Sequence, residues 1–199
     1  MVCLLLLGPP GAGKGTQGQL VASRLSIPPI STGDTFRAHV AAGTPLGLSA
    51  RGYLEAGDLV PDAVTCAMLS ERLTEPDTAA GFLLDGFPRT TAQAEALQGI
   101  LAERGHELTR VIELQVGAAE LVERLSARRV VIDGQSLQRS DDTPDTIRHR
   151  LEVYQRETVP LSDWYGSLGL LSRVDASGDV DEVTARILDS FSRNGAGVD

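Results

Sequence analysis

The stretch Val2-Cys-Leu-Leu-Leu-Leu7-Gly8-Pro-Pro-Gly-Ala-Gly13-Lys14-Gly15-Thr16 decides the fold of this chain. Val2–Leu7 is a short, wholly apolar run, which is typical of a strand buried on both faces of a parallel sheet. The glycines and prolines end that strand, and Lys14–Leu25 then carries apolar residues at helical spacing. The segment therefore predicts a strand, a glycine-rich loop and a helix in immediate succession.

The loop satisfies the pattern G-x-x-x-x-G-K from Gly8 to Lys14. Small residues let the backbone bend so that successive N–H groups point at one anion, and the helix that begins there adds its positive dipole end. The Lys14 ammonium reaches the terminal phosphates as a point charge. Gly15 stands where the full pattern has Ser or Thr, and Thr16 follows; the alternative is a glycine-rich turn that binds nothing. The expected phosphate-binding residues are Gly11, Ala12, Gly13, Lys14, Gly15 and Thr16.

The alternation of strand and helix continues along the chain. Further apolar strands are predicted at Gly81–Leu84, Arg110–Val116 and Leu168–Val174. Helices are predicted after them, near 91–103, 118–128 and 180–191. Such alternation favours an α/β fold in three layers, with a parallel sheet covered by helices on both sides.

Two regions break the alternation. Residues 34–73 have only helical patterns, whereas residues 129–142 are polar and contain Asp133-Gly134, a hairpin turn signal between short β-prone arms. Both are candidates for flaps over a ligand site.

Composition excludes several classes of function. The chain has 199 residues, 42% of them hydrophobic, and a net charge of -9, which argues against a nucleic-acid partner because such proteins present a basic face. The apolar run at the start is too short to span a membrane. Only Cys3 and Cys66 are present, too few for a zinc site, and they indicate a reducing, cytoplasmic setting. Lys14 is the only lysine among 18 basic residues.

Five ordered segments together resemble the nucleoside monophosphate kinases, and the adenylate kinase branch of that family most of all. The resemblance runs from Val2 to about Val180. The matching segments are GPPGAGKGTQ at 8–17, STGDTFR at 31–37, GDLVPD at 57–62, DGFPR with Gln93 from 85, and RSDD at 139–142 with Arg150, Tyr154 and Thr158-Val-Pro160.

The resemblance implies reversible phosphoryl transfer from MgATP to AMP, giving two ADP. Catalysis of this kind is positioning plus charge stabilisation, which suits the planar, bidentate guanidinium of arginine. By resemblance, Arg37 and Arg89 hold the AMP phosphate. Arg128, Arg139 and Arg150 clamp the ATP phosphates and the transferring group, so the implied catalytic set is Lys14, Arg89, Arg128, Arg139 and Arg150.

The same resemblance implies how the two bases are read. Thr32 and Gln93 help to recognise the adenine of AMP, since a glutamine amide can donate and accept at once. The alternative for Gln93 is a surface helix residue. Arg124 lies near the ATP base, and the loop that ends at Gly178 lies against it through backbone groups. The implied AMP site is Thr32, Arg37, Leu59, Val60, Gly86, Arg89, Gln93, Arg139 and Arg150.

A magnesium ion is expected with ATP. Asp85 follows a buried strand, at the carboxyl edge of the sheet where ligands bind in such folds, and Mg²⁺ keeps several waters when carboxylates hold it. Asp85 is expected to act through those waters, and Thr16 to touch the metal or a phosphate. The alternative for Asp85 is a capping role in the following turn. The flap is too short for the zinc insertion of some relatives, so no zinc is expected.

The expected organisation is one kinase domain, with an AMP-binding insert at 31–73 and a short lid at 128–142. The core is then 1–30, 74–127 and 143–193, and the resemblance suggests a monomer. Two alternatives remain open from the sequence: a UMP/CMP-type kinase, which Thr32 and Gln93 disfavour, and a nucleotide-binding scaffold without catalysis, which Lys14 and the arginines disfavour.

Overall fold

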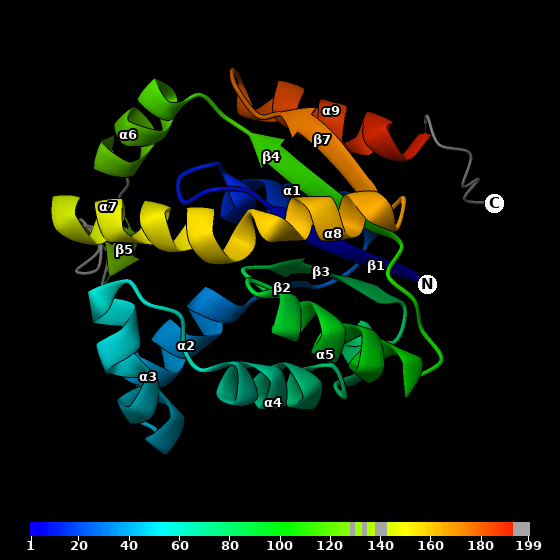
Figure 1. The fold of residues 1–199 in the computed structure, drawn as a ribbon, viewed down its shortest axis with the longest axis horizontal. Coiled ribbons are helices and arrows are strands. Elements are labelled where there is room, and N and C mark those ends of the chain that lie inside the picture. Colours follow the sequence, from blue (N-terminus) through cyan, green and yellow to red (C-terminus); the bar gives the residue numbers. More distant parts are fainter. Residues whose placement is uncertain (128–129, 133–134, 138–142, 193–199) are drawn as a thin grey trace.

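The computed structural model describes residues 1–127, 130–132, 135–137 and 143–192. Its main sheet contains β1 (Val2–Leu7), β2 (Pro29–Ser31), β3 (Gly81–Asp85), β4 (Arg110–Gln115) and β7 (Leu171–Asp175). These five strands are all parallel and lie in the order β2-β3-β1-β4-β7 (Figure 1). The predicted parallel sheet is therefore confirmed, with the strand of the glycine-rich segment at its centre.

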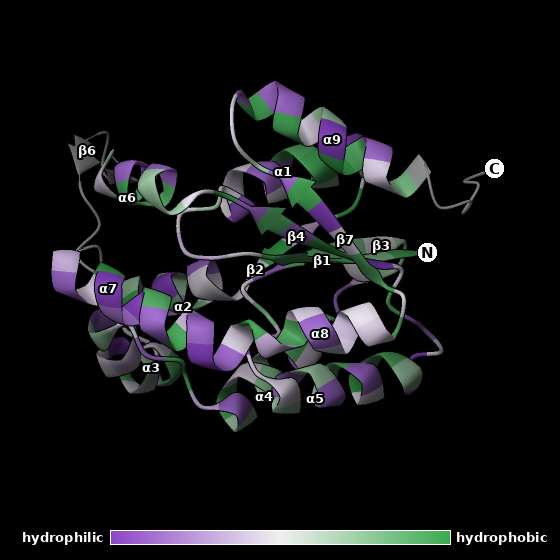
Figure 2. Ribbon diagram, turned by 45° about the horizontal axis from the view of Figure 1, so that its top comes forward, coloured by the Kyte–Doolittle hydropathy of each residue, from purple (hydrophilic) through white to green (hydrophobic). Residues whose placement is uncertain are grey.

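Helices cover both faces of this sheet. They are α1 (Lys14–Leu25), α2 (Thr32–Ala41), α3 (Pro45–Ala56), α4 (Asp62–Arg72), the 3₁₀ turn η1 (Pro76–Thr78), α5 (Thr91–Ala102), α6 (Ala118–Ala127), α7 (Pro144–Val153), the π-helical turn η2 (Tyr154–Thr158), α8 (Pro160–Ser167) and α9 (Val180–Ser192). Seen from the side, α1 and α9 lie on one face of the sheet and α4, α5 and α8 on the other (Figure 2). The arrangement is the three-layer α/β/α fold that the sequence predicts.

The central strand explains why its sequence is apolar throughout. Leu4 and Leu6 pack into the hydrophobic cluster beneath α1 and α9, whereas Cys3, Leu5 and Leu7 pack into the cluster beneath α4, α5 and α8. Side chains alternate across a strand, so a strand covered on both sides must be apolar at every position.

Side-chain caps fix where several site-bearing helices begin. Ser31, Thr44, Thr90 and Thr143 each accept a hydrogen bond from a backbone N–H in the first turn of α2, α3, α5 and α7 respectively. Proline follows the cap directly in α3 and α7, where its missing N–H costs nothing.

Helices α2, α3 and α4 form what we call the three-helix segment, in agreement with the helical pattern predicted for 34–73. Its own cluster contains only three buried residues, Phe36, Ala50 and Val60. Helices α2 and α3 approach so closely that a Cβ on Gly47 would lie 2.1 Å from the backbone oxygen of His39. Only glycine fits at that position.

The local structure departs from the sequence prediction at two strands and agrees with it at the hairpin. The edge strand β2 was not predicted, because three residues that include a proline show no periodicity. The last strand begins at Leu171 rather than Leu168, since α8 runs to Ser167 and a turn fills the interval. The hairpin expected in the polar region is confirmed by the antiparallel strands β5 (Val130–Ile132) and β6 (Gln135–Leu137), although Asp133-Gly134 lies outside the described residues.

Candidate functional site

A cavity of about 650 Å³ opens at the carboxyl ends of the strands. Its lining comes from the glycine-rich loop, the three-helix segment, the loop after β3, α7 and the loop after β7. Cavities in open parallel sheets lie at this edge because the loops that follow the strands diverge there. Parts of the chain far apart in sequence thus share one hollow.

The glycine-rich loop curls at the end of β1, and its backbone forms one wall of the cavity. Gly11 has φ 85°. A Cβ there would lie 2.8 Å from Cγ of Leu125, so the loop is both left-handed and tightly packed at this point. The Lys14 ammonium donates to the carbonyls of Gly8 and Pro9 at 2.8 and 3.0 Å, which folds its side chain back over the loop. All six predicted phosphate-binding residues line the cavity.

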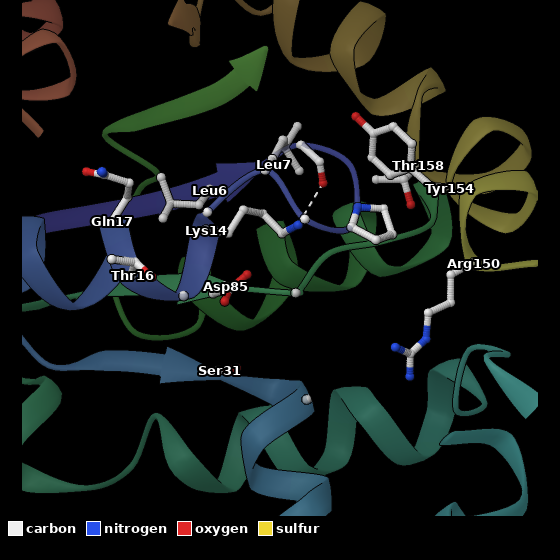
Figure 3. Close-up of a pocket in the computed structure, with 18 of the residues that line it drawn as sticks. Leu6, Leu7, Lys14, Thr16, Gln17, Ser31, Asp85, Arg150, Tyr154 and Thr158 are labelled. Atoms are coloured by element: carbon white, nitrogen blue, oxygen red, sulfur yellow. Dashed lines mark hydrogen bonds between the residues drawn. The ribbon is translucent and has the colours of Figure 1, made fainter. Parts of the chain in front are cut away.

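Cationic side chains from distant elements converge on this space. Among the described residues, the lining carries five cations against three carboxylates: Lys14, Arg37, Arg89, Arg124 and Arg150 against Asp34, Asp58 and Asp85. Figure 3 shows Arg150 reaching into the open space across from Lys14 and Asp85. In a chain of net charge -9, such a local reversal of sign favours an anionic ligand.

Asp85 ends β3 beside the start of α1. A Cβ on Gly15 would lie 3.8 Å from Oδ2 of Asp85, so the carboxylate is close to the turn that carries Thr16. In the part of the chain that the structure describes, no hydrogen bond or ion pair engages this carboxylate. It therefore accepts no bond from a backbone N–H of the following turn, as a capping residue would. A half-buried acid beside a phosphate-type loop is well suited to a hydrated cation.

The loop after β3 joins the three-helix segment to the sheet through one carbonyl. Gly86 O accepts hydrogen bonds from Oγ1 of Thr32 and from Nε of Arg89, both at 2.9 Å. Thr158 Oγ1 donates to the carbonyl of Arg89 at 2.9 Å and fixes that backbone from the other side. Gly86 and Arg89 line the cavity, whereas Thr32 is 3% exposed and lies behind it.

Gln93 is held by both ends of its amide. Its Nε2 donates to Oδ1 of Asp62 at 2.7 Å, and its Oε1 accepts from the backbone N–H of Arg89 at 2.8 Å. Asp62 also accepts from Oγ1 of Thr90 at 3.0 Å. Because a carboxylate only accepts and an N–H only donates, the orientation of the amide is fixed. Gln93 is 2% exposed, which excludes the alternative of a surface helix residue. It is not among the cavity-lining residues.

The remaining predicted AMP-site residues are placed differently from one another. Leu59 lines the cavity, whereas Val60 is turned into the small cluster of the three-helix segment. Arg37 pairs with Asp34 on α2, and Arg150 donates to the carbonyl of Leu54 at 3.4 Å. Arg128 and Arg139 lie outside the described residues.

The far end of the cavity is bounded by the loop after β7. Ala176 and Gly178 line it, and Arg124 donates to the carbonyl of Ala176 at 2.8 Å while pairing with Glu120 at 2.5 Å. Arg124 also lies over the glycine-rich loop, since a Cβ on Gly13 would be 3.8 Å from its Nη1. Arg124 and Gly178, the two residues predicted to lie near the ATP base, therefore both lie at the loop after β7.

Sequence reasoning gave no role to several residues that line the cavity. Tyr154 and Thr158 both do so, from the π-helical turn η2. Burial, with a smaller contribution from the charge of Glu113, raises the pKa of Tyr154 to about 12, so its phenol stays protonated at neutral pH. The signal was present, because both residues belong to the last matching segment, and π-helical turns are frequent at functional sites.

The described residues lack two further features. Among the described residues, no group of three or more His, Cys, Asp or Glu side chains is arranged to hold a metal ion. None of the helices in those same parts of the chain combines the length and the apolar character needed to cross a membrane.

The fold and the cavity together define a P-loop α/β enzyme of the phosphoryl-transfer class. Comparison with known proteins identifies the family within this class. The sequence pattern described as "Adenylate kinase" matches residues 6–170. The chain is 55% identical over 185 residues to the adenylate kinase of Thermobifida fusca, covering 93% of this chain and 95% of the relative. It is 52% identical over 190 residues to that of Mycobacteroides abscessus, covering 96% and 99%. The chain belongs to the adenylate kinase family.

Proposed function

We propose that the enzyme transfers a phosphoryl group reversibly from MgATP to AMP, giving two ADP, and so maintains the balance of adenine nucleotides. The observation that carries this proposal is a cavity in which a glycine-rich phosphate loop faces arginines from α2, the loop after β3, α6 and α7. ATP lies along the glycine-rich loop and the loop after β7, and AMP lies against the three-helix segment. Both nucleotides then meet between Lys14 and Arg150.

The chemistry asks for positioning and charge stabilisation rather than for proton transfer. The acceptor phosphate has a second pKa of about 6 by analogy with phosphorylated side chains, so it is already anionic at neutral pH and needs no general base. Arg37 and Arg89 hold that acceptor phosphate. Lys14, together with Arg150 and with Arg128 and Arg139, which lie outside the described residues, neutralises the charge that spreads over the transferring group.

Magnesium bound with ATP supplies charge neutralisation between the phosphates. Asp85 and Thr16 are the residues of this chain that would hold it, Asp85 through water. The fit rests on the carboxylate beside the start of α1, which has no protein partner in the described structure. A zinc site is not part of the proposal.

We further assign residues 31–73 to an AMP-binding insert and 128–142 to a lid, with a core of 1–30, 74–127 and 143–193. The small separate cluster around Phe36, Ala50 and Val60 supports the part of this insert formed by α2 and α3, whereas Leu69 and Leu73 pack into the main core. A monomeric protein in the cytoplasm, without nucleic-acid or membrane partners, is the simplest setting for ATP, AMP and ADP as substrates.

The decisive measurement is ADP formation from MgATP with AMP, UMP, CMP or GMP offered separately. We expect strong turnover with AMP alone. Turnover with UMP or CMP would instead support the pyrimidine-kinase alternative, and no turnover with any acceptor would support the scaffold.

A matched pair of variants tests the acceptor side directly. Thr32→Ala removes one of the two hydrogen bonds to Gly86 O and should raise the KM for AMP about tenfold, as for the loss of a well-placed hydrogen bond. Thr32→Ser keeps the hydroxyl and should stay close to the parent. Equal behaviour of the two variants would contradict the role given to this hydroxyl.

A further inference from the structure

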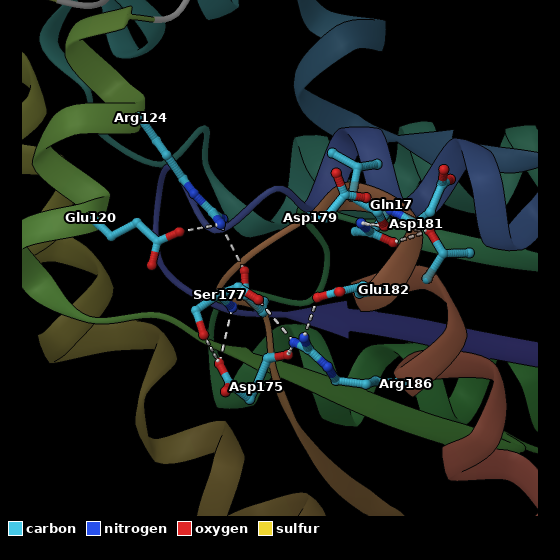
Figure 4. Close-up of polar contacts among 12 residues, drawn as sticks. Gln17, Glu120, Arg124, Asp175, Ser177, Asp179, Asp181, Glu182 and Arg186 are labelled. Carbon is cyan, nitrogen blue, oxygen red and sulfur yellow. Dashed lines mark hydrogen bonds and ion pairs between the residues drawn. The ribbon is translucent and has the colours of Figure 1, made fainter.

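The loop between β7 and α9 is held by two arginines that donate to successive backbone carbonyls. Nη1 of Arg186 donates to Asp175 O at 2.7 Å and to Ser177 O at 2.9 Å. Arg124, from α6, donates to the carbonyl between them, Ala176 O. Figure 4 shows the two guanidinium groups reaching this loop from different elements. Each carbonyl in turn is thus fixed by a cation, and such bonds are stronger than those between neutral groups.

The end of the loop is tied to the phosphate-binding helix. Gln17, which follows the glycine-rich loop and is 3% exposed, donates from Nε2 to Val180 O at 2.9 Å. Its Oε1 accepts from Oγ1 of Thr184 at 2.7 Å. The Asp179 carbonyl accepts from the Val183 N–H at 3.1 Å. These bonds of Gln17 hold the first turn of α9 against the first turn of α1.

These contacts single out Gly178. From 175 to 180, within the part of the chain that the structure describes, its carbonyl is the only one that accepts no hydrogen bond. Gly178 lines the cavity, and a Cβ on it would lie 3.7 Å from Nη2 of Arg186. Arg186 itself is not among the cavity-lining residues, and its hydrogen bonds with this part of the cavity wall run through the loop carbonyls.

We propose that Arg186 is a positioning residue for the base of the phosphoryl donor. By fixing the carbonyls of Asp175 and Ser177, it holds the backbone of Ala176 and Gly178 in place against the base and sharpens the preference for adenine. Adenine and guanine present an amino donor and a carbonyl acceptor, respectively, at the same ring position. A fixed protein group discriminates between them, whereas a mobile loop rearranges to suit either. This inference rests on the proposed function.

The first test replaces the guanidinium. Arg186→Met keeps the length and apolar stem of the side chain but donates nothing. We expect the KM for ATP to rise about 5- to 10-fold, as for the loss of a charge-assisted hydrogen bond, and the preference for ATP over GTP to fall by a similar factor. The KM for AMP should change less than about twofold by the same reasoning, because no hydrogen bond or ion pair among the described residues joins the three-helix segment to this loop. Arg186→Lys retains an ammonium donor and should recover most of the ATP preference.

Two controls separate positioning from a general loss of stability. Glu182→Gln removes the ion-pair partner of Arg186, 3.2 Å away, but leaves both carbonyl contacts, so donor kinetics should not change. Arg104→Met removes the same kind of bond elsewhere, since Nη2 of Arg104 donates to Ser70 O at 2.9 Å. It should lower the melting temperature as much as Arg186→Met does while leaving the KM for ATP unchanged.

Calorimetric titration with ATP alone gives a readout that does not depend on turnover. Weaker ATP binding by Arg186→Met, with unchanged binding of AMP, supports the proposal even if the parent enzyme were to use another acceptor. Arg186 would be merely structural if Arg186→Met and Arg104→Met lost stability equally and neither changed ATP affinity or the ATP/GTP ratio. A parent enzyme that binds ATP but phosphorylates no AMP would overturn the proposed function instead.

Discussion

The two sides of the cavity are built differently. The proposed ATP-binding side, formed by the glycine-rich loop and the loop after β7, is continuous with the central sheet and its two large clusters. Within the three-helix segment, α2 and α3 have a separate cluster with only three buried residues, whereas α4 packs into the main core through Leu69. Side-chain bonds, such as Thr32 to Gly86 and Gln93 to Asp62, also join the segment to the rest of the domain. His149 of α7 adds a contact to Asp58, with Nε2 and Oδ1 2.6 Å apart.

This difference indicates a division of labour. A wall continuous with the main core opens only when the whole domain unfolds, whereas an element with few buried contacts opens at lower free energy. We expect the proposed ATP-binding side to be rigid, and α2 and α3 to open before the rest of the described chain. Of three predictions, the first compares the two sides directly, and the other two concern Lys14 and Asp175 on the proposed ATP-binding side.

The largest effect should come from core truncation. Phe82→Ala, on β3, should cost about 3–5 kcal/mol of global stability, because Phe82 is 2% exposed in the main core. Phe36→Ala, in the three-helix segment, should cost less globally but raise hydrogen exchange across α2 and α3 and increase the KM for AMP. Equal global destabilisation without a local exchange effect in Phe36→Ala would mean that the segment and the sheet unfold as one unit.

Loss of the Lys14 ammonium should act on the reaction and spare the fold. Lys14→Ala should lower kcat by about 100- to 1,000-fold, the usual effect of removing one group that stabilises developing charge. The melting temperature should change little, since the ammonium's bonds to the carbonyls of Gly8 and Pro9 lie within its own loop. Arg148→Gln, at an exposed position on α7, is the control, and a kcat within tenfold of the parent for Lys14→Ala would refute the assignment.

The smallest effect concerns acid. The hydroxyl and N–H of Ser177, with a lesser contribution from Arg186, lower the pKa of Asp175 below its ordinary value of 3.8. A carboxyl whose pKa is lowered by folding stabilises the native state above the ordinary pKa and ceases to do so as the pH falls through the lowered value. Asp175→Asn should therefore lower the melting temperature slightly at neutral pH and flatten its fall between about pH 5 and about pH 2. Asp163→Asn, on α8 away from this loop, is the control; identical slopes for both variants would contradict the assignment.

Much of the fold could be predicted from the sequence because its signals are local. The buried central strand, the glycine-rich loop and the helix after it can each be recognised from consecutive residues. The helical pattern of 34–73 and the hairpin signal of 129–142 are local in the same sense. The strand β2 was not predicted because three residues are too few to show a period. The strand β7 begins three residues later than predicted, because α8 extends to Ser167.

The site was predictable where a side chain reaches the cavity from a recognisable motif, as Lys14, Arg37 and Arg89 do. It was less predictable where motif residues face inward. Thr32 and Gln93 lie behind the cavity wall, and Val60 packs into the core of the three-helix segment. No sequence pattern indicates that Asp62 fixes the amide of Gln93, 31 positions away.

The sequence by itself determined the class of fold, the phosphate-binding loop and the family, because each depends on residue types at short spacing or on motifs in a fixed order. The tertiary structure alone decided which carbonyls Arg186 and Arg124 fix, and that Gln17 meets Thr184 across 167 positions. Such contacts depend on how the loops at the strand ends come together in space. Local propensity specifies the elements, but long-range packing decides which polar groups become partners.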